Sequence, residues 1–375
     1  MKRKVGILTQ PLGDNYGGIL QNWSLQQVLK DLGYFPVTIK YIRRYKFKQG
    51  FYYIYAIGTY IFKHIIRHKT RIYNQLPWQH KPNKELYKFI KNNIHLTNYK
   101  NLYKKGERKL LRNKIKYIII GSDQVWRPKY NKNYLNLMFC SFVPKESDMC
   151  RIAYGASFGT KDWEYDDTQS EMAKIAIQEF KAISVREKSG IQLCKEYLNT
   201  NATFVLDPTL LLAPQQYLKV VPEIIINKIN KRSVGIYILD HNIEKIKFTE
   251  EINNILNLEP FFIGKINQKT YQKDSVEEWI AAFSRCEFII TDSYHGTIFS
   301  IIFNKPFITL LNKDRGAERF ISLLGELDLM DRLVGPSEIH RSRKIIKNDI
   351  DWEIVNSKLS YLRNISIKYL SNALF

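Results

Sequence analysis

The sequence predicts an α/β protein with two doubly wound halves, each built on a parallel sheet, that face a central cleft. Short apolar runs typical of buried strands alternate with helical stretches up to about residue 206, and a second series begins near residue 233. The chain has 375 residues, 45% hydrophobic and 25% charged, which suits a globular protein of two domains. We place the two domains at 1–210 and 211–350. A terminal helix is expected over about 351–375, and it could pack against the first domain.

The first half opens with a strand, a loop, a helix and a second strand, which is how a parallel sheet begins. Gly33 ends the first helix, and glycine is typical of helix ends. The later part of this half continues to alternate strands with helices. The predicted elements are strands at 4–9, 36–41, 117–121, 151–156, 183–185 and 203–206, and helices at 19–32, 171–181 and 188–197.

The second half repeats the alternation. Its predicted elements are strands at 233–239, 261–264, 288–290 and 307–311, and helices at 243–256, 276–283, from 296 onward and at 318–325. Because parallel strands end at the same edge of a sheet, the loops that follow them are expected to form the site. This expectation holds for any such fold and names no reaction.

The positive charge of the chain is concentrated in one segment. The formal net charge is +22, and residues 40–116 alone carry 21 basic and 2 acidic side chains. Within this basic aromatic segment, taken as 43–116, residues 43–71 combine aromatic and apolar side chains with basic flanks, which favours contact with an anionic membrane surface. A nucleic-acid surface and a helical core with a solvated cationic face are the alternatives. No nucleic-acid-binding module is recognisable, so we expect no nucleic acid partner.

Other features restrict the class of protein. No apolar run reaches the ~18 residues that cross a bilayer, and the first apolar run is too short for a signal peptide. We therefore expect a cytoplasmic protein. The four cysteines are widely spaced without a Cys-x-x-Cys pair, so we expect inert thiols and no metal site.

A glycine-bearing loop over residues 13–18 joins the first strand to the first helix. Glycines there let a ligand approach the backbone, and the start of the helix offers N–H groups to an anion. The candidate residues are Asp14, Asn15, Gly17 and Gly18. The loop matches neither the Walker nor the dinucleotide-binding pattern, and a structural turn is the competing interpretation.

A second polar loop follows the apolar strand at 117–121. Ser122, Asp123 and Gln124 lie at the strand end, where loops commonly carry function. Asp123 also suits the cap of a following helix.

A third loop combines Asp292, Ser293, Tyr294 and His295 at another strand end. A histidine there can donate to an anionic ligand or act as an acid near neutral pH. The alternative is a helix capped by Asp292 or Ser293, with the histidine satisfied locally.

Three arginines are candidates for binding an anion, because the planar guanidinium suits phosphate and carboxylate. They are Arg186, directly after a strand, and Arg315 and Arg319 near a helix start. Each could instead form a surface ion pair.

These motifs, in this order, resemble the polysaccharide pyruvyl transferase family from Gly6 to about Leu333, apart from residues 43–105. The matching segments are 15–21, 121–126, 154–159, 184–187, 207–209 and 291–296. The resemblance implies a fold similar to GT-B glycosyltransferases, with two Rossmann-like domains facing a cleft. It implies phosphoenolpyruvate as donor, a sugar hydroxyl pair of a bacterial surface glycan as acceptor, and a pyruvate ketal as product, with no further cofactor.

The resemblance also implies roles. His295 is the candidate acid or phosphate donor, Arg186 matches the family's anion-binding arginine, and Asp14, Asp123 and Asp292 are candidates to orient or deprotonate the acceptor. We take His295, Asp14 and Asp292 as catalytic. The substrate-binding candidates are Arg186, Arg315, Arg319, Ser293, Tyr294, Asn15, Gly17, Gly18, Ser122, Asp123, Gln124 and Ser157.

One position departs from the family pattern. Better-known members carry Arg-Leu-His where this chain has Ser293, Tyr294 and His295, so the arginine two places before the histidine is absent. Arg315 and Arg319 are the residues that could replace it in space.

The resemblance suggests a function for the basic aromatic segment, which is to hold the protein at a membrane surface. Glycan repeat units are usually modified on a lipid carrier, so a lipid-linked acceptor is expected, with the protein peripheral on the inner face of the plasma membrane. Two rivals remain open. One is a GT-B glycosyltransferase that uses a nucleotide sugar, and the other is a nucleic-acid-binding module, which would show a steep salt dependence.

Overall fold

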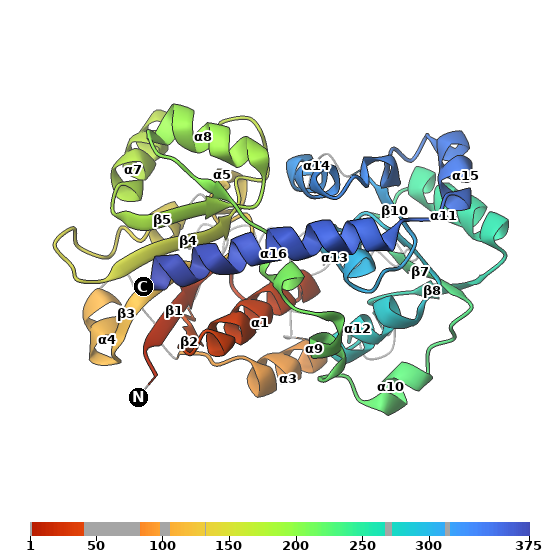
Figure 1. The fold of residues 1–375 in the computed structure, drawn as a ribbon, viewed down its shortest axis with the longest axis horizontal. Coiled ribbons are helices and arrows are strands. Elements are labelled where there is room, and N and C mark those ends of the chain that lie inside the picture. Colours follow the sequence, from red (N-terminus) through yellow and green to blue (C-terminus); the bar gives the residue numbers. More distant parts are fainter. Residues whose placement is uncertain (1, 41–82, 98–105, 132, 267–271, 312–315) are drawn as a thin grey trace, which may run out of the picture.

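Two parallel sheets, one in each half of the chain, form the framework of the computed structural model (Figure 1). The structure describes residues 2–40, 83–97, 106–131, 133–266, 272–311 and 316–375. Residues 43–71, for which we predict membrane contact, and Arg315 lie outside the described residues. The two parallel sheets confirm the predicted α/β class.

The first sheet has the strand order β2-β1-β3-β4-β5-β6, and its neighbouring strands are all parallel. Its strands are β1 (Lys4–Leu8), β2 (Phe35–Thr38), β3 (Ile115–Ile120), β4 (Cys150–Ala156), β5 (Phe180–Val185) and β6 (Thr203–Phe204). The helices of this half are α1 (Tyr16–Asp31), α3 (Lys84–Asn93), α4 (Gly106–Arg112), α5 (Pro128–Asn131), α6 (Leu135–Met138), α7 (Asp167–Ile177) and α8 (Lys188–Leu198).

The second sheet has the order β11-β10-β9-β7-β8 and is also parallel. Its strands are β7 (Ser233–Tyr237), β8 (Glu259–Phe262), β9 (Phe288–Thr291), β10 (Phe307–Leu310) and β11 (Leu333–Val334). Its helices are α11 (Ile243–Leu256), α12 (Val276–Arg285), α13 (Tyr294–Ile302), α14 (Ala317–Glu326) and α15 (Ile339–Lys347). The 3-10 helix η2 (Pro208–Leu211), α9 (Pro214–Leu218) and α10 (Glu223–Asn227) connect the sheets, and η4 (Met330–Arg332) precedes β11.

Each sheet reverses its strand order at one point. The chain passes from β1 to β2 on one side and then to β3 on the other side of β1, and β7, β8 and β9 repeat this arrangement. The gaps between β1 and β3 and between β7 and β9 are therefore topological switch points, where ligands of doubly wound sheets commonly bind.

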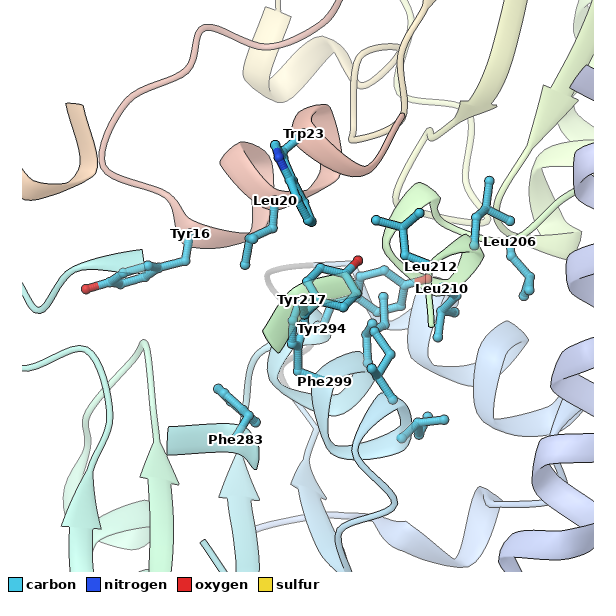
Figure 2. Packing of buried hydrophobic residues seen from close by; sticks show 14 of the residues in the cluster. Tyr16, Leu20, Trp23, Leu206, Leu210, Leu212, Tyr217, Phe283, Tyr294 and Phe299 are labelled. Carbon is cyan, nitrogen blue, oxygen red and sulfur yellow. The ribbon is translucent and has the colours of Figure 1, made fainter. Parts of the chain in front are cut away.

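A continuous apolar core joins the two sheets, and α1 lies at its centre. Trp23 of α1 packs against Tyr217 of α9, which packs against Phe299 of α13 (Figure 2), and Tyr16 of α1 stacks on Trp279 of α12. Two smaller cores cover the outer parts of the sheets. Because α1 contacts the core on most of its sides, it is held rigidly between the two halves.

The last helix, α16 (Trp352–Leu374), runs across the molecule and lies against the first sheet (Figure 1). The Tyr369 hydroxyl donates to the carbonyl of Ala153 in β4, and the Ser366 hydroxyl accepts from the N–H of Leu206. The Tyr34 hydroxyl donates to the carbonyl of Leu374.

The domain boundary near residue 210 stays a prediction.

Several element bounds differ from the sequence prediction. Helix α1 begins at Tyr16 and not at residue 19, because Asn15 caps it and accepts the N–H of Gly17. Helix α7 begins at Asp167 and not at 171, because Asp166 and Gln169 form a capping box, and Phe180 already belongs to β5. The sequence prediction omitted the helices α3, α4, α5, α6, α9, α10 and α15, the 3-10 helices η2 and η4, and the strand β11.

The described residues contain neither a membrane-spanning helix nor a cluster of metal ligands. Within this part of the chain, no helix combines the length and apolar character needed to span a bilayer. Among the same residues, no three His, Cys, Asp or Glu side chains are grouped so that they could hold a metal ion.

Candidate functional site

A cavity of about 810 Å³ lies at the two switch points, so both halves of the chain contribute to its wall. Its lining comes largely from the segments that follow β1, β3, β7 and β9. The lining residues are Gln10, Pro11, Asp14, Asn15, Asp123, Gln124, Tyr130, Tyr237, Leu239, Lys273, Asp292, Ser293, Tyr294, His295, Arg319 and Phe320. Polar residues that are far apart in the sequence therefore meet around one space.

His295 lies in the first turn of α13, directly after β9. Ser293 caps this helix, since its hydroxyl accepts the N–H of Gly296. The His295 side chain is buried, and its Nε2 atom has no hydrogen-bond partner and lies 3.8 Å from Asp207 Oδ2. Burial lowers the pKa of His295 to about 4, even though the nearby Asp207 carboxylate raises it. His295 is therefore neutral at pH 7.

Asp207 and Arg186 form a fully buried ion pair behind the cavity wall. Arg186 Nη1 lies 2.6 Å from Asp207 Oδ2, which also accepts a hydrogen bond from the Gln21 side chain. The hydroxyl of Thr209 donates to the other carboxylate oxygen. Burial alone would raise the pKa of Asp207, but nearby cationic groups lower it below its ordinary value. Since His295 is neutral at pH 7, Arg186 is the cation that keeps Asp207 ionised.

Asp123 connects this ion pair to the cavity. Its Oδ1 atom lies 3.1 Å from Arg186 Nη2, and its side chain reaches the cavity wall. Its backbone φ is +108°, a conformation that costs a non-glycine residue about 1–3 kcal/mol. Burial opposes ionisation, but Arg186 holds the pKa of Asp123 below its ordinary value.

Among the residues that the structure describes, Arg319 of α14 is the arginine that lines the cavity. Its guanidinium carbon lies 4.9 Å from the centre of the Tyr294 ring, and that of Arg186 lies 5.2 Å from the same centre. Burial and the neighbouring Arg186 lower the pKa of Arg319 to about 10, so Arg319 is still charged at pH 7. Arg186 does not line the cavity, because Asp207 and Asp123 hold it behind the wall.

The loop after β1 has a different structure from the one we predicted. Gly17 and Gly18 both lie in the first turn of α1, where Gly17 faces the His295 ring. Asn15 is the cap, and Asp14 is exposed, with Oδ1 accepting the N–H of Asn83. Asp14 and Asn15 line the cavity, whereas neither glycine does.

The Asp292 carboxylate forms hydrogen bonds and an ion pair with residues of the second half of the chain. Oδ1 accepts the N–H of Leu239, and Oδ2 accepts the N–H of Asp240 and pairs with Lys245 Nζ at 2.7 Å. These contacts hold the loop after β7 against the start of α13. This arrangement gives Asp292 a structural task, and its expected catalytic role stays a prediction.

The other substrate-binding candidates divide between the wall and the interior. Gln124 lines the cavity, and its Oε1 atom accepts from Arg127. Ser122 is buried against Asp207 and Arg186. The backbone of Ser157 pairs with Asp123 and Trp126, which supports the loop after β3. Ser122 and Ser157 do not line the cavity.

Sequence reasoning missed two charged residues of this region. Asp207 lay in a matching segment but received no role, because its partners Arg186 and His295 are 21 and 88 positions away. Lys273 belongs to no motif, and its position before α12 gave no signal. In the structure Lys273 Nζ donates to the carbonyl of Asp14 across the two halves, and burial lowers its pKa.

The comparisons with known proteins agree with this arrangement. The family model for polysaccharide pyruvyl transferase matches residues 15–314. The chain belongs to this family. Membership makes it a transferase-type enzyme and implies a saccharide acceptor. A search of curated proteins found no match.

Solved structures show the fold. The UDP-GlcNAc 2-epimerase from Methanocaldococcus jannaschii superposes with a TM-score of 0.56 at 13% identity, covering 94% of this chain and 93% of that one. A glycosyltransferase from Rickettsia africae ESF-5 gives a TM-score of 0.51 at 9% identity, covering 98% and 94%. The epimerase from Neisseria meningitidis bound to UDP-GlcNAc gives 0.50 at 9%, covering 98% and 94%. These similarities confirm the predicted GT-B-like fold.

Proposed function

We propose that this pyruvyl transferase family member transfers the enolpyruvyl-derived group of phosphoenolpyruvate to two hydroxyls of a saccharide, which yields a pyruvate ketal and inorganic phosphate. One observation carries the proposal: His295 and Arg319 line the same cavity at the two switch points of a chain that belongs to this family. A histidine and an arginine at such a point suit a small donor with two anionic groups.

The donor is expected to bind at the Arg319 end. Phosphoenolpyruvate carries a phosphate and a carboxylate, and a guanidinium binds either group through paired hydrogen bonds. The caps of α1 and α13, Asn15 and Ser293, both line the cavity, so two helix N-termini add partial positive charge there. Lys273 supplies a second cation to the wall.

The reaction needs a proton delivered to the methylene carbon of the donor. That proton makes C2 resemble an oxocarbenium ion, which one sugar hydroxyl attacks while losing its own proton. The C2–O bond to phosphate then breaks and phosphate leaves with the bonding electrons. The second hydroxyl attacks C2 and loses its proton to the departing phosphate, which closes the ketal. The lowered pKa of His295 leaves the imidazole neutral at pH 7, and a bound dianion would raise this pKa, so the donor itself would convert His295 into an acid or a phosphate-binding cation.

The carboxylates at the wall are candidates for the acceptor side. Asp14 is exposed at the cavity and could accept a hydroxyl proton. Asp123 is held ionised by Arg186, so it suits orientation of the sugar through accepted hydrogen bonds. We further propose that the acceptor is a lipid-linked repeat unit of a bacterial surface glycan, modified at the inner face of the plasma membrane.

An assay of phosphate release tests this function. Wild type, mixed with phosphoenolpyruvate and lipid-linked glycan from a surface-polysaccharide-producing bacterium, should release phosphate and leave acid-labile pyruvate on the glycan. His295→Gln should release neither. Transfer of a sugar from a nucleotide sugar, with no response to phosphoenolpyruvate, would instead identify a GT-B glycosyltransferase.

A further inference from the structure

Two neighbouring glycines in the first turn of α1 have very different surroundings. Both have ordinary helical backbone angles with negative φ, so backbone geometry does not require glycine at either position. Glycine in a helix costs roughly 1 kcal/mol relative to alanine. A pair of glycines in the first turn therefore needs another reason.

At Gly17 the reason is the His295 ring. A Cβ atom placed on Gly17 would lie 2.1 Å from His295 Nδ1 and 2.5 Å from Cγ, and both distances are far inside van der Waals contact. Gly17 belongs to the first half and His295 to the second. The imidazole therefore packs directly on the α1 backbone, in the space that any side chain would fill.

At Gly18 no such contact exists. A Cβ atom there would meet the Asn15 side chain at 3.6 Å and 3.8 Å, which is ordinary van der Waals contact. The two positions are adjacent in the same helical turn, so they form a matched pair for a test.

We propose that Gly17 is a positioning residue, which lets the His295 imidazole lie against the first turn of α1 and so fixes the ring in the wall of the cavity. This inference deepens the proposed function, on which its catalytic meaning rests. The contact also places the ring beside the positive end of the α1 dipole, which disfavours imidazolium. Arg186 and Arg319 act in the same direction, while Asp207 and Asp123 act against it.

Substitution of Gly17 should therefore change the titration of His295. Histidine side chains labelled with ¹⁵N would be titrated by NMR in the full chain, with the signal of His295 assigned from His295→Gln among the seven histidines. The midpoint should be near pH 4 in wild type and in Gly18→Ala. In Gly17→Ala it should rise toward the ordinary value near 6.5, because the displaced ring leaves its buried position.

If Gly17→Ala is too unstable for titration, a double-mutant cycle of Gly17→Ala and His295→Ala tests the proposal through melting temperatures. Gly17→Ala should lower the melting temperature in wild type but not in a His295→Ala background, where the missing ring leaves room for the methyl group. Gly18→Ala should leave the melting temperature equal or higher in both backgrounds.

Two results would overturn the proposal: an unchanged His295 midpoint in Gly17→Ala, or an equal melting-temperature loss with and without the ring. Phosphoenolpyruvate binding would be measured on the same proteins and should weaken in Gly17→Ala. If wild type does not bind phosphoenolpyruvate, the proposed function fails, while the titration and the cycle still decide the role of Gly17.

Discussion

A buried, neutral histidine gives the protein a specific pH dependence of stability. Burial lowers the pKa of His295 from 6.5 to about 4 in the folded protein. Above pH 6.5 the residue is neutral in both the folded and the unfolded state, so its contribution is constant. As the pH falls from 6.5 toward 4, only the unfolded state takes up the proton, and the free energy of unfolding should fall by up to about 3 kcal/mol. Urea unfolding at pH 7 and pH 4.5 measures this loss.

The matched variant is His295→Gln, which cannot titrate. Its free energy of unfolding should depend less on pH in this window. The pKa values of Asp123 and Asp207 are lowered in the folded protein, so the stability that these carboxylates contribute is lost mainly as the pH falls through and below their ordinary value of 3.8, at the acidic end of this window. Equal pH dependence in both proteins would show that His295 is not held neutral by burial.

Substitution by asparagine should have different effects on stability and activity at Asp292 and at Asp14. Asp292→Asn removes the charge that pairs with the buried Lys245, and breaking such a pair costs roughly 3–5 kcal/mol. Asp14 is exposed, so Asp14→Asn should change stability by less than about 0.5 kcal/mol while lowering ketal formation. Urea unfolding with a ketal assay separates these effects. A stable, inactive Asp292→Asn would contradict a purely structural role and support the catalytic role that the sequence predicted.

At the level of single residues, the sequence indicated which residues lie near the cavity better than it indicated the role of each residue. Asp14, Asn15, Asp123, Gln124, His295 and Arg319 do line the cavity, because strand ends of a parallel sheet share one edge. Arg186 and Ser122 are instead held behind the wall by Asp207. Which side of the wall a residue occupies depends on contacts between distant segments, and no local pattern encodes it.

Helix α16 is the element that supports the buried carboxylate from behind. The Ser366 hydroxyl accepts the N–H of Leu206, directly before Asp207, and Arg363 Nε donates to the carbonyl of Leu210 in η2. Ser366→Ala leaves the buried N–H of Leu206 unsatisfied and should cost about 1–3 kcal/mol of stability. The matched control is Tyr361→Ala on the same helix, where the side chain is 68% exposed and little should change. Urea unfolding of the two variants compares them, and equal losses would contradict the support role.

The helices that the sequence predicted well have clear local signals. The bounds of α11 were predicted as 243–256 and found as Ile243–Leu256, where an asparagine caps each end. Helix α15 was missed, since it has no side-chain cap bond and is rich in charged residues. Helix α1 was predicted to start late because glycines usually mark loops. Here the Asn15 cap and the approach of His295 account for Gly17.

For the whole molecule, the continuous core indicates that the two halves move little relative to one another. Tyr16 of α1 stacks on Trp279 of α12 at 5.5 Å between ring centres, and its hydroxyl donates to the carbonyl of Asp274. Tyr217 and Phe299 extend the same apolar contact (Figure 2). Domains joined by large apolar interfaces do not move freely.

The cavity should therefore be preformed. Small-angle X-ray scattering of the protein with and without saturating phosphoenolpyruvate should give the same radius of gyration. A clear decrease on binding would indicate closure of one half over the other and would contradict a rigid cleft.

The most direct test is calorimetric titration of wild type and Arg319→Gln with phosphoenolpyruvate and, separately, with UDP-GlcNAc. Wild type should bind phosphoenolpyruvate saturably. Arg319→Gln should bind it roughly 30- to 150-fold more weakly, because a charged hydrogen-bonding partner that contributes about 2–3 kcal/mol is lost. Saturable binding of UDP-GlcNAc together with no binding of phosphoenolpyruvate would contradict the proposed reaction and favour a nucleotide-sugar enzyme.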